Sequence, residues 1–219
     1  MQRLTEIAPL LYRALLETTL MVSISIFFAV LLGLPLGILL YITANPLLFR
    51  IKPLNQFLGA VTNVIRSFPF IILIVAIMPI ATWLTNSSHG PVFASVALSL
   101  AAIPLFARLV ETSFNGVNTG VIEASIAGGA SLWLIVTDVL IPESKRGITQ
   151  AITLTIISIV AFSATAGVVG GGGIGDLAIR YGYYRYDTVT MVATVVVLII
   201  IVQLIQLIGD YLSQRQEGD

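Results

Sequence analysis

Four stretches of the chain contain no charged residue and are long enough to cross a membrane as helices. They are residues 18–49, 67–107, 147–175 and 188–209. A spanning helix needs about 20 apolar residues, because each residue rises about 1.5 Å and the hydrocarbon core is about 30 Å thick. The second stretch is interrupted by a polar turn from Asn86 to Pro91, so we expect two helices there. The pattern therefore predicts five membrane helices, at about residues 17–43, 67–85, 92–113, 147–169 and 188–212.

The composition indicates that lipid is the main solvent of the chain. Only 10% of the 219 residues are charged and 57% are hydrophobic, whereas soluble domains carry about a quarter charged residues. A soluble protein of this size would still have to cover a large wet surface. The first apolar run is also about twice as long as the core of a cleaved signal sequence, so we expect it to remain as a helix. The predicted fold class is an all-α integral membrane protein.

The balance of charges and the scarcity of reactive side chains exclude several kinds of function. The 11 basic and 11 acidic residues cancel, which gives no indication of a nucleic-acid partner. The chain has no cysteine and one histidine, His89, so we predict no metal site and no cofactor on this chain. Its only lysines are Lys52 and Lys145, and neither lies in a glycine-rich phosphate-binding loop. We therefore do not expect the chain to hydrolyse ATP itself.

Basic residues in the loops predict how the chain is oriented in the membrane, because cytoplasmic loops carry an excess of Lys and Arg. The segments 44–56 and 114–146 each hold two Lys or Arg residues, whereas the turn at 86–91 holds none. We therefore place both segments in the cytoplasm. Five spans then put the N-terminus outside and the C-terminus inside, although Arg180 and Arg185 fall on the outer side.

Prolines and one arginine interrupt the apolar pattern. Each proline removes a backbone hydrogen bond and favours a kink that neighbouring helices must satisfy. Arg66 precedes the second predicted helix, and two interpretations are open: a side chain that snorkels to the inner membrane surface, or a role at a pore mouth or in helix packing. Gly33 and Gly37 have the spacing that permits close helix contact. The prolines within or beside the predicted helices are Pro35, Pro69, Pro79 and Pro104.

Residues 114–146 form the longest segment that cannot span the membrane. Asn115 to Gly120 have turn chemistry, and apolar residues then recur at intervals of three and four, which predicts two short helices. Ser131 is the expected N-cap of the second helix and Pro142 its expected end. Small residues at 127–130 would let another chain approach closely.

This helical hairpin has two interpretations from its pattern alone. It either lies in the lipid headgroup zone or forms a docking element for a soluble partner. In the second case Glu123 would supply a polar contact or a cap, while Ala124, Ser125 and Gly129 would allow tight seating.

The hairpin resembles the EAA loop of ABC importer permeases. Glu123-Ala124-Ser125, then Gly129, then Val139-Leu140-Ile141-Pro142 keep the spacing of that motif. Three positions depart from it, because Ser125 replaces an alanine, Val139 an isoleucine and Ile141 a leucine, and all three changes preserve size or character. The resemblance implies that the motif residues couple this chain to an ATPase. They are Glu123, Ala124, Ser125, Gly129, Val139, Ile141 and Pro142.

Further stretches resemble the permeases of methionine importers, from about residue 15 to residue 211. The resemblance implies that residues 1–219 form a single transmembrane domain with the type I ABC importer permease fold. In that fold the coupling loop, residues 114–146, forms a cytoplasmic hairpin between the transmembrane helices. The stretches that carry the resemblance are Arg66–Leu73, the glycine-rich run that ends at Gly175, Tyr181–Tyr183 and Gln206–Asp210.

The same resemblance implies an activity and a set of partners. The chain would translocate methionine, of both D and L configuration, across the bacterial cytoplasmic (inner) membrane. It would act as a homodimer, with two cytoplasmic ABC ATPases that bind ATP and magnesium. An extracytoplasmic methionine-binding protein, lipid-anchored or soluble, would deliver the substrate. Another amino acid or small solute is the alternative cargo.

Two small-residue segments near the fourth predicted helix are candidates for the transport pathway. Gly170, Gly172 and Gly175 match a dinucleotide-binding pattern, but they follow a membrane helix and not a soluble strand, so we reject that interpretation. With Gly173 they are expected to form a flexible or tightly packed turn at the outer mouth.

The fourth predicted helix itself carries hydroxyl side chains. Ser158, Ser163 and Thr165 either bond to the preceding helical turn or form one wall of a pathway. A zwitterionic substrate favours a pathway of small, mildly polar side chains without a fixed charge. In that case the constriction would be formed by Ser163, Ala164, Thr165, Ala166 and Gly167.

Two other classes of protein remain as alternatives to an ATP-driven importer. An ion-coupled secondary transporter generally needs intramembrane carboxylates or histidines, but the chain has no Asp or Glu between Glu17 and Glu111 or between Glu143 and Asp176. An intramembrane enzyme needs convergent catalytic side chains, and the uncharged spans offer no such set.

Overall fold

The apolar runs form long helices wherever no polar turn interrupts them. The computed structural model describes residues 2–215, with side chains from Ile7 onward, and the regular elements within this part are all helices. Four helices are long and apolar enough to cross a membrane. They are α1 (Gln2–Ala44), α4 (Pro91–Asn115), α8 (Lys145–Val168) and α10 (Thr188–Arg215).

The second predicted span, 67–85, is part of a bent pair of helices. It corresponds almost entirely to α3 (Phe70–Thr85), which meets α2 (Lys52–Ser67), a helix that was not predicted, at a bend of 106°. Pro69 has no backbone N–H and restricts the residue before it to extended conformations, and Phe68 accordingly has φ −72° and ψ 129°. The predicted set of five spans is therefore four continuous helices and one bent pair. The other three prolines lie inside α1, α3 and α4, which continue through them.

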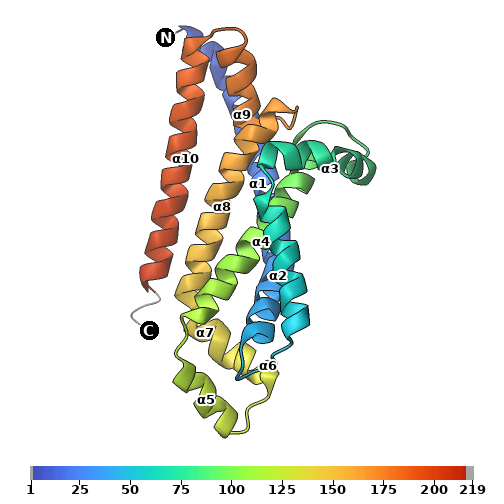
Figure 1. The fold of residues 1–219 in the computed structure, drawn as a ribbon. Coiled ribbons are helices and arrows are strands. Elements are labelled where there is room, and N and C mark those ends of the chain that lie inside the picture. Colours follow the sequence, from blue (N-terminus) through green and yellow to red (C-terminus); the bar gives the residue numbers. More distant parts are fainter. Residues whose placement is uncertain (1, 216–219) are drawn as a thin grey trace.

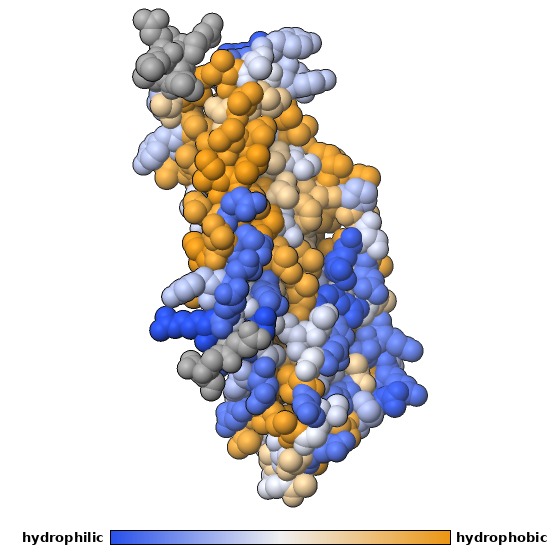
Figure 2. Space-filling model, turned by 90° about the vertical axis from the view of Figure 1, so that its left-hand side faces the viewer, coloured by the Kyte–Doolittle hydropathy of each residue, from blue (hydrophilic) through white to orange (hydrophobic). Residues whose placement is uncertain are grey.

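The long helices run side by side, and the short ones gather at the two ends of the bundle (Figure 1). α5 (Thr119–Ala127) and α6 (Leu132–Leu134) lie at one end. The N-terminus and α9 (Gly173–Leu177) lie at the other. α10 flanks the bundle, and α3 projects from its side. Figure 2 shows mainly apolar surface toward the N-terminal end and more hydrophilic surface toward the end that holds α5.

Close contact between α1 and α4 forms the centre of the bundle. A Cβ atom on Gly33 would lie 2.9 Å from the carbonyl oxygen of Ile103, and one on Gly37 would lie 2.7 Å from that of Ala107. The predicted role of these two glycines is therefore confirmed. Burial of apolar surface gives little drive for association in lipid, so such close packing is what holds membrane helices together.

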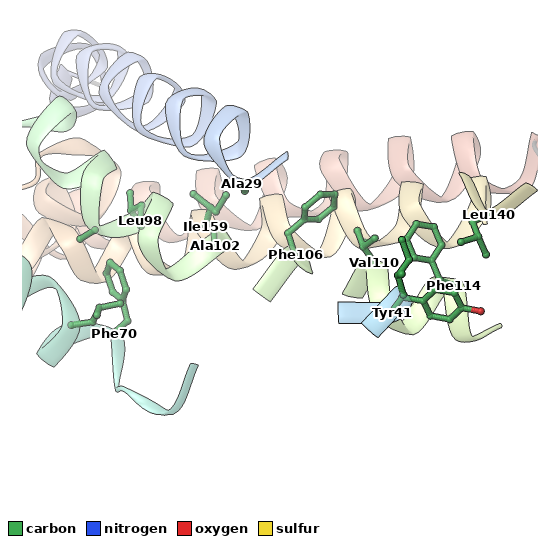
Figure 3. Packing of buried hydrophobic residues seen from close by; sticks show 14 of the residues in the cluster. Ala29, Tyr41, Phe70, Leu98, Ala102, Phe106, Val110, Phe114, Leu140 and Ile159 are labelled. Carbon is green, nitrogen blue, oxygen red and sulfur yellow. The ribbon is translucent and has the colours of Figure 1, made fainter. Parts of the chain in front are cut away.

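Buried aromatic side chains fill the remaining space along α4. Phe106, Val110 and Phe114 follow one another along this helix, and Tyr41 of α1 lies beside Phe114 (Figure 3). The ring centroids of Tyr41 and Phe114 are 5.5 Å apart. This cluster continues into the short helices beyond Asn115, because Ile122 and Leu140 belong to the same buried core.

Candidate coupling surface and membrane pathway

The first arm of the hairpin begins at a side-chain cap and ends at a glycine turn. The backbone N–H of Gly120 donates to Oδ1 of Asn118 at 2.9 Å, which caps α5. The helix ends at Gly128, and Gly129 has φ +81°. The N–H of Ala130 then donates back to the carbonyl of Ser125 at 3.0 Å. Gly129 is therefore needed for its backbone conformation, which L residues rarely adopt.

The second arm begins as predicted but does not end where predicted. Ser131 caps it, because its Oγ accepts the N–H of Leu134 at 3.3 Å. The arm then continues from α6 through a π-helical segment, η1 (Ile135–Leu140), into α7 (Ile141–Glu143). The expectation that Pro142 ends the helix is wrong. Pro142 lies inside the arm, in α7 directly after the π-helical segment, and the chain departs from helical geometry only at Ser144.

The inner face of the hairpin is fixed to the membrane bundle. Ile122, Ile135 and Leu140 are at most 2% exposed and pack in the same core as Phe114 at the end of α4. The motif residues Val139, Ile141 and Pro142 are half-buried in the second arm. Because its inner side chains are locked in this core, the hairpin should move with α4 and α8 as one body.

The outer face of the hairpin carries the remaining motif residues. Glu123, Ala124 and Gly129 are exposed, and Ser125 is half-buried with its Oγ bonded to the carbonyl of Val121 at 2.7 Å. Glu123 does not cap the helix, because Asn118 does so. Among the described residues, Glu123 has no hydrogen-bond or ion-pair partner, so its carboxylate is free to contact another protein.

Exposed apolar side chains surround these motif residues, and the sequence analysis did not select them as a site. Trp133 is 76% exposed, and no described residue covers its ring. No signal in the sequence separated them, because they share the spacing of three and four with the apolar residues that face the core. We call this set the outer patch, and its members are Val121, Ile126, Leu132, Trp133 and Leu134.

Most of the small residues predicted to form a constriction serve a contact within the chain instead. Ser163, Ala166 and Gly167 are buried. A Cβ on Gly167 would lie 2.2 Å from the backbone nitrogen of Asp176, so α9 crosses α8 at this point. These three residues therefore do not line a surface pathway. Ala164 and Thr165 are only half-buried, and their place in a pathway stays a prediction.

The hydroxyl groups on α8 follow the simpler of the two interpretations. Ser158 Oγ donates to the carbonyl of Leu154 at 2.8 Å, and Ser163 Oγ donates to that of Val160 at 2.7 Å. Both bonds lie within the preceding helical turn, so neither hydroxyl is held ready for a substrate.

The glycine-rich run is a tightly packed turn, not a flexible one. Gly170, Gly172 and Gly173 have φ values of +83°, +79° and +81°. The carbonyl of Gly170 accepts the N–H of Gly90 at 2.8 Å. The N–H of Gly173 donates to Glu17 Oε2 at 2.9 Å. The run follows the membrane helix α8 and leads into α9 (Gly173–Leu177), so the structure gives no support to a dinucleotide site.

The last glycine of the run serves helix packing. Gly175 lies inside α9, and a Cβ on it would lie 2.3 Å from the backbone of Ala164 on α8. Only glycine allows the two helices to cross at this separation.

Arg66 lies at the last turn of α2, beside a cavity of about 390 Å³ under the bend. The rings of Phe70 and Phe162 stack there with their centroids 4.8 Å apart. The cavity lies between α2, α3, α4 and α8. Its lining consists of Ile65, Arg66, Phe68, Pro69, Phe70, Leu73, Ala101, Leu105 and Phe162.

A second arginine joins α2 to α4, and the sequence analysis did not identify this contact. Arg108 Nη1 donates to Glu111 Oε2 at 2.7 Å, while its Nη2 donates to the carbonyl of Gly59 and to Asn63 Oδ1, both at 3.2 Å. The spacing of Arg108 and Glu111 could have indicated the ion pair. The bonds to α2 join residues far apart in the sequence and could not have been read from it.

Comparison with known families and proteins gives a consistent picture. The family described as binding-protein-dependent transport system inner membrane component matches residues 33–218. A protein of Vibrio cholerae named probable D-methionine transport system permease protein MetI is 45% identical over 206 residues, which are 94% of this chain and 92% of that protein. The D-methionine transport system permease protein MetI of Escherichia coli is 41% identical over 158 residues, 72% of this chain and 73% of that one.

Solved structures agree with these relatives. A chain from inward facing conformations of the MetNI methionine ABC transporter superposes with a TM-score of 0.94 at 39% identity, covering 96% of this chain and 98% of that one. A chain from an amino acid ABC transporter crystallised with histidines superposes with a TM-score of 0.81 over 98% of this chain and 97% of that one. Its identity is only 17%, so it shows the fold alone.

Proposed function

The chain belongs to the binding-protein-dependent transport system inner membrane component family, and from this premise we propose that it forms half of the membrane pore of an ATP-driven methionine importer. The relatives that cover most of its length are named as D-methionine transport permeases. The cargo is therefore methionine, in both the D and the L configuration. Two copies of the chain enclose the pathway in the bacterial cytoplasmic membrane.

The outer patch of the hairpin is the observation that carries this proposal. Large apolar side chains exposed together at one end of a protein usually mark a binding surface, and Trp133 at 76% exposure is the most prominent of them. The partner is a cytoplasmic ABC ATPase, one for each copy of the chain. Glu123 adds a free carboxylate at the edge of the contact, and the small residues Ala124 and Gly129 leave room for the partner's surface.

ATP and magnesium bind to the ATPase and not to this chain. Closure of the ATPase pair on ATP brings the two hairpins together, and each hairpin moves α4 and α8 because its inner face is buried against them. That motion opens the outer mouth and closes the inner one, and hydrolysis reverses it. The bundle thus alternates between two arrangements whose populations the nucleotide state sets.

The orientation follows from the position of the basic residues. Arg50 lies between α1 and α2, Lys52 begins α2, and Lys145 and Arg146 begin α8, at the end of the bundle that holds the hairpin. An excess of such residues marks the cytoplasmic side. The N-terminus therefore lies outside, where a lipid-anchored or soluble methionine-binding protein delivers the substrate, and the C-terminus lies in the cytoplasm.

The intramembrane carboxylates do not favour an ion-coupled transporter. Glu17 accepts hydrogen bonds from Arg13 and from the N–H of Gly173, and Glu111 is paired with Arg108. Both carboxylates are thus engaged by groups of the same chain and are not left open for a transported ion. The structure thus offers more support for coupling through the hairpin.

Co-purification tests the docking surface. The wild-type chain, expressed with its ATPase and extracted in detergent, should retain the ATPase in stoichiometric amount. Glu123→Arg and Gly129→Trp should each lose it while eluting as folded membrane protein. Ser88→Arg, an exposed substitution in the outer turn between α3 and α4, is the matched control and should retain it. Undiminished ATPase in both hairpin variants would refute the docking proposal.

A competition assay tests the cargo. Cells or proteoliposomes that contain the complete transporter should take up labelled methionine, and an excess of unlabelled L- or D-methionine should suppress the uptake. If another amino acid competes and methionine does not, the chain belongs to an importer with a different substrate.

A further inference from the structure

An arginine without an acidic partner borders the cavity at the bend between α2 and α3. No described carboxylate forms an ion pair with Arg66. The neighbouring arginine Arg108, in contrast, is bound to Glu111, Gly59 and Asn63. Arg66 is also the only charged residue in the lining of this cavity.

The cavity lies deep in the membrane and not at its surface. Its walls include Ala101 and Leu105, which are close to the middle of α4 (Pro91–Asn115). At 1.5 Å per residue, Leu105 is about 15 Å from the nearer end of that helix, which is half the thickness of the hydrocarbon core. A snorkelling arginine at the inner membrane surface does not fit this position. An arginine at such depth is costly unless it faces a wet cavity and meets an anion.

The rest of the cavity matches an apolar side chain. Phe70 and Phe162 stack on one another within it, and Phe68 at its edge is 47% exposed. Figure 3 shows Phe70 extending from α3 toward Leu98 and Ala102 of α4. A thioether makes favourable contacts with aromatic rings. The volume of about 390 Å³ is sufficient for a small amino acid.

We infer that Arg66 binds the carboxylate of methionine in transit, with the methionine side chain against Phe68 and Phe162. This inference rests on the proposed function. A planar guanidinium is suited to a carboxylate, because it can donate two parallel hydrogen bonds. This inference replaces the expectation of a pathway without a fixed charge. Arg66 is exposed at the side of the cavity, so water competes for the guanidinium and the substrate can leave.

The absence of cysteine from the chain provides a direct test. In the complete transporter in detergent, Leu105→Cys places the only thiol of this chain in the cavity wall. L-methionine at millimolar concentration should slow alkylation of this thiol by a small maleimide at least fivefold. The amide of methionine, which lacks the carboxylate, should not slow it. Ser88→Cys in the outer turn is the control thiol, and methionine should not change its labelling.

Arg66 variants in the Leu105→Cys background decide the inference. Arg66→Gln should abolish the protection by methionine, and Arg66→Lys should keep part of it. Arg50→Gln, at the cytoplasmic end, should leave it intact. Equal protection in Arg66→Gln, or none in the unaltered Arg66 background, would overturn the inference. Ile65→Cys serves as a second reporter if Leu105→Cys does not assemble.

Uptake and ATPase retention in the same preparations separate this inference from the function on which it rests. If the transporter imports methionine and retains its ATPase but the cavity thiol is never protected, the carboxylate site is wrong and the importer stands. If methionine is not imported at all, the carboxylate site and the proposed methionine cargo are both wrong.

Discussion

Two turns at opposite ends of the molecule are made by glycines with the same backbone conformation, but their surroundings differ. Gly129 in the hairpin and Gly173 in the outer turn both have φ +81°. A Cβ on Gly129 would meet nothing within 4 Å, whereas one on Gly173 would lie 2.6 Å from Thr18 Oγ1 and 2.7 Å from Met21 Cε. The outer turn is thus completed by its own chain, and the hairpin turn presents an open face. A glycine in a positive-φ turn does not by itself distinguish an internal contact from a docking surface.

Alanine at these two glycines should give the largest difference between the two ends. Gly173→Ala combines backbone strain with overpacking against α1, and should lower the free energy of unfolding by about 3 kcal/mol. Gly129→Ala has the strain alone and should lower it by about 1 kcal/mol. Denaturation of the detergent-solubilised chain measures both. Equal losses would show that the outer turn relaxes as freely as the open one.

Tryptophan substitutions test whether the open face is a binding surface. The chain has two tryptophans, and they are almost equally exposed, Trp133 at 76% on the hairpin and Trp83 at 77% on α3. Trp133→Ala should weaken binding of the ATPase by about 2 kcal/mol, or about 30-fold, as expected for a tryptophan at the centre of an interface. Trp83→Ala should leave the affinity unchanged. An identical affinity in both variants would remove Trp133 from the interface.

The stability of the outer turn should also depend on a single hydroxyl group. Thr18 is 4% exposed, and its Oγ1 accepts the N–H of Ile174 at 2.9 Å. Thr18→Val keeps the shape of the side chain but leaves that N–H buried without an acceptor, so the free energy of unfolding should fall by about 1.5 kcal/mol. Thermal unfolding checks the value. A neutral effect would mean that water reaches the start of α9.

The continuous spans and the hairpin could be predicted from the sequence, since both depend on local patterns. Absence of charge over the required length defined α4, α8 and α10. The spacing between Glu123 and Pro142 located the hairpin, and its residues suggested the cap at Ser131. α2 was missed as part of a broken span because Asn55, Gln56 and Asn63 interrupt its apolar pattern.

Contacts between residues far apart in the chain could not be predicted from the sequence. The bond from Gly173 to Glu17 joins residues 156 positions apart, so the glycine-rich run could be interpreted as either flexible or packed. The small residues Ala166 and Gly167 were assigned to a pathway because small side chains suit both a pore and a helix crossing. Only the position of α9 against α8 separates those two uses.

The smallest effect is expected at the cap of the second hairpin arm. Ser131 is exposed, and its bond from the N–H of Leu134 is long at 3.3 Å, so Ser131→Ala should lower the free energy of unfolding by only about 0.5 kcal/mol, at the low end for an N-cap. Water can replace the lost acceptor at this end, unlike at Thr18. Amide hydrogen exchange should therefore accelerate at residues 132–134 and stay unchanged in α9. If exchange in α9 also accelerates, loss of this cap loosens the far end of the bundle as well, and its effect is not local to the hairpin.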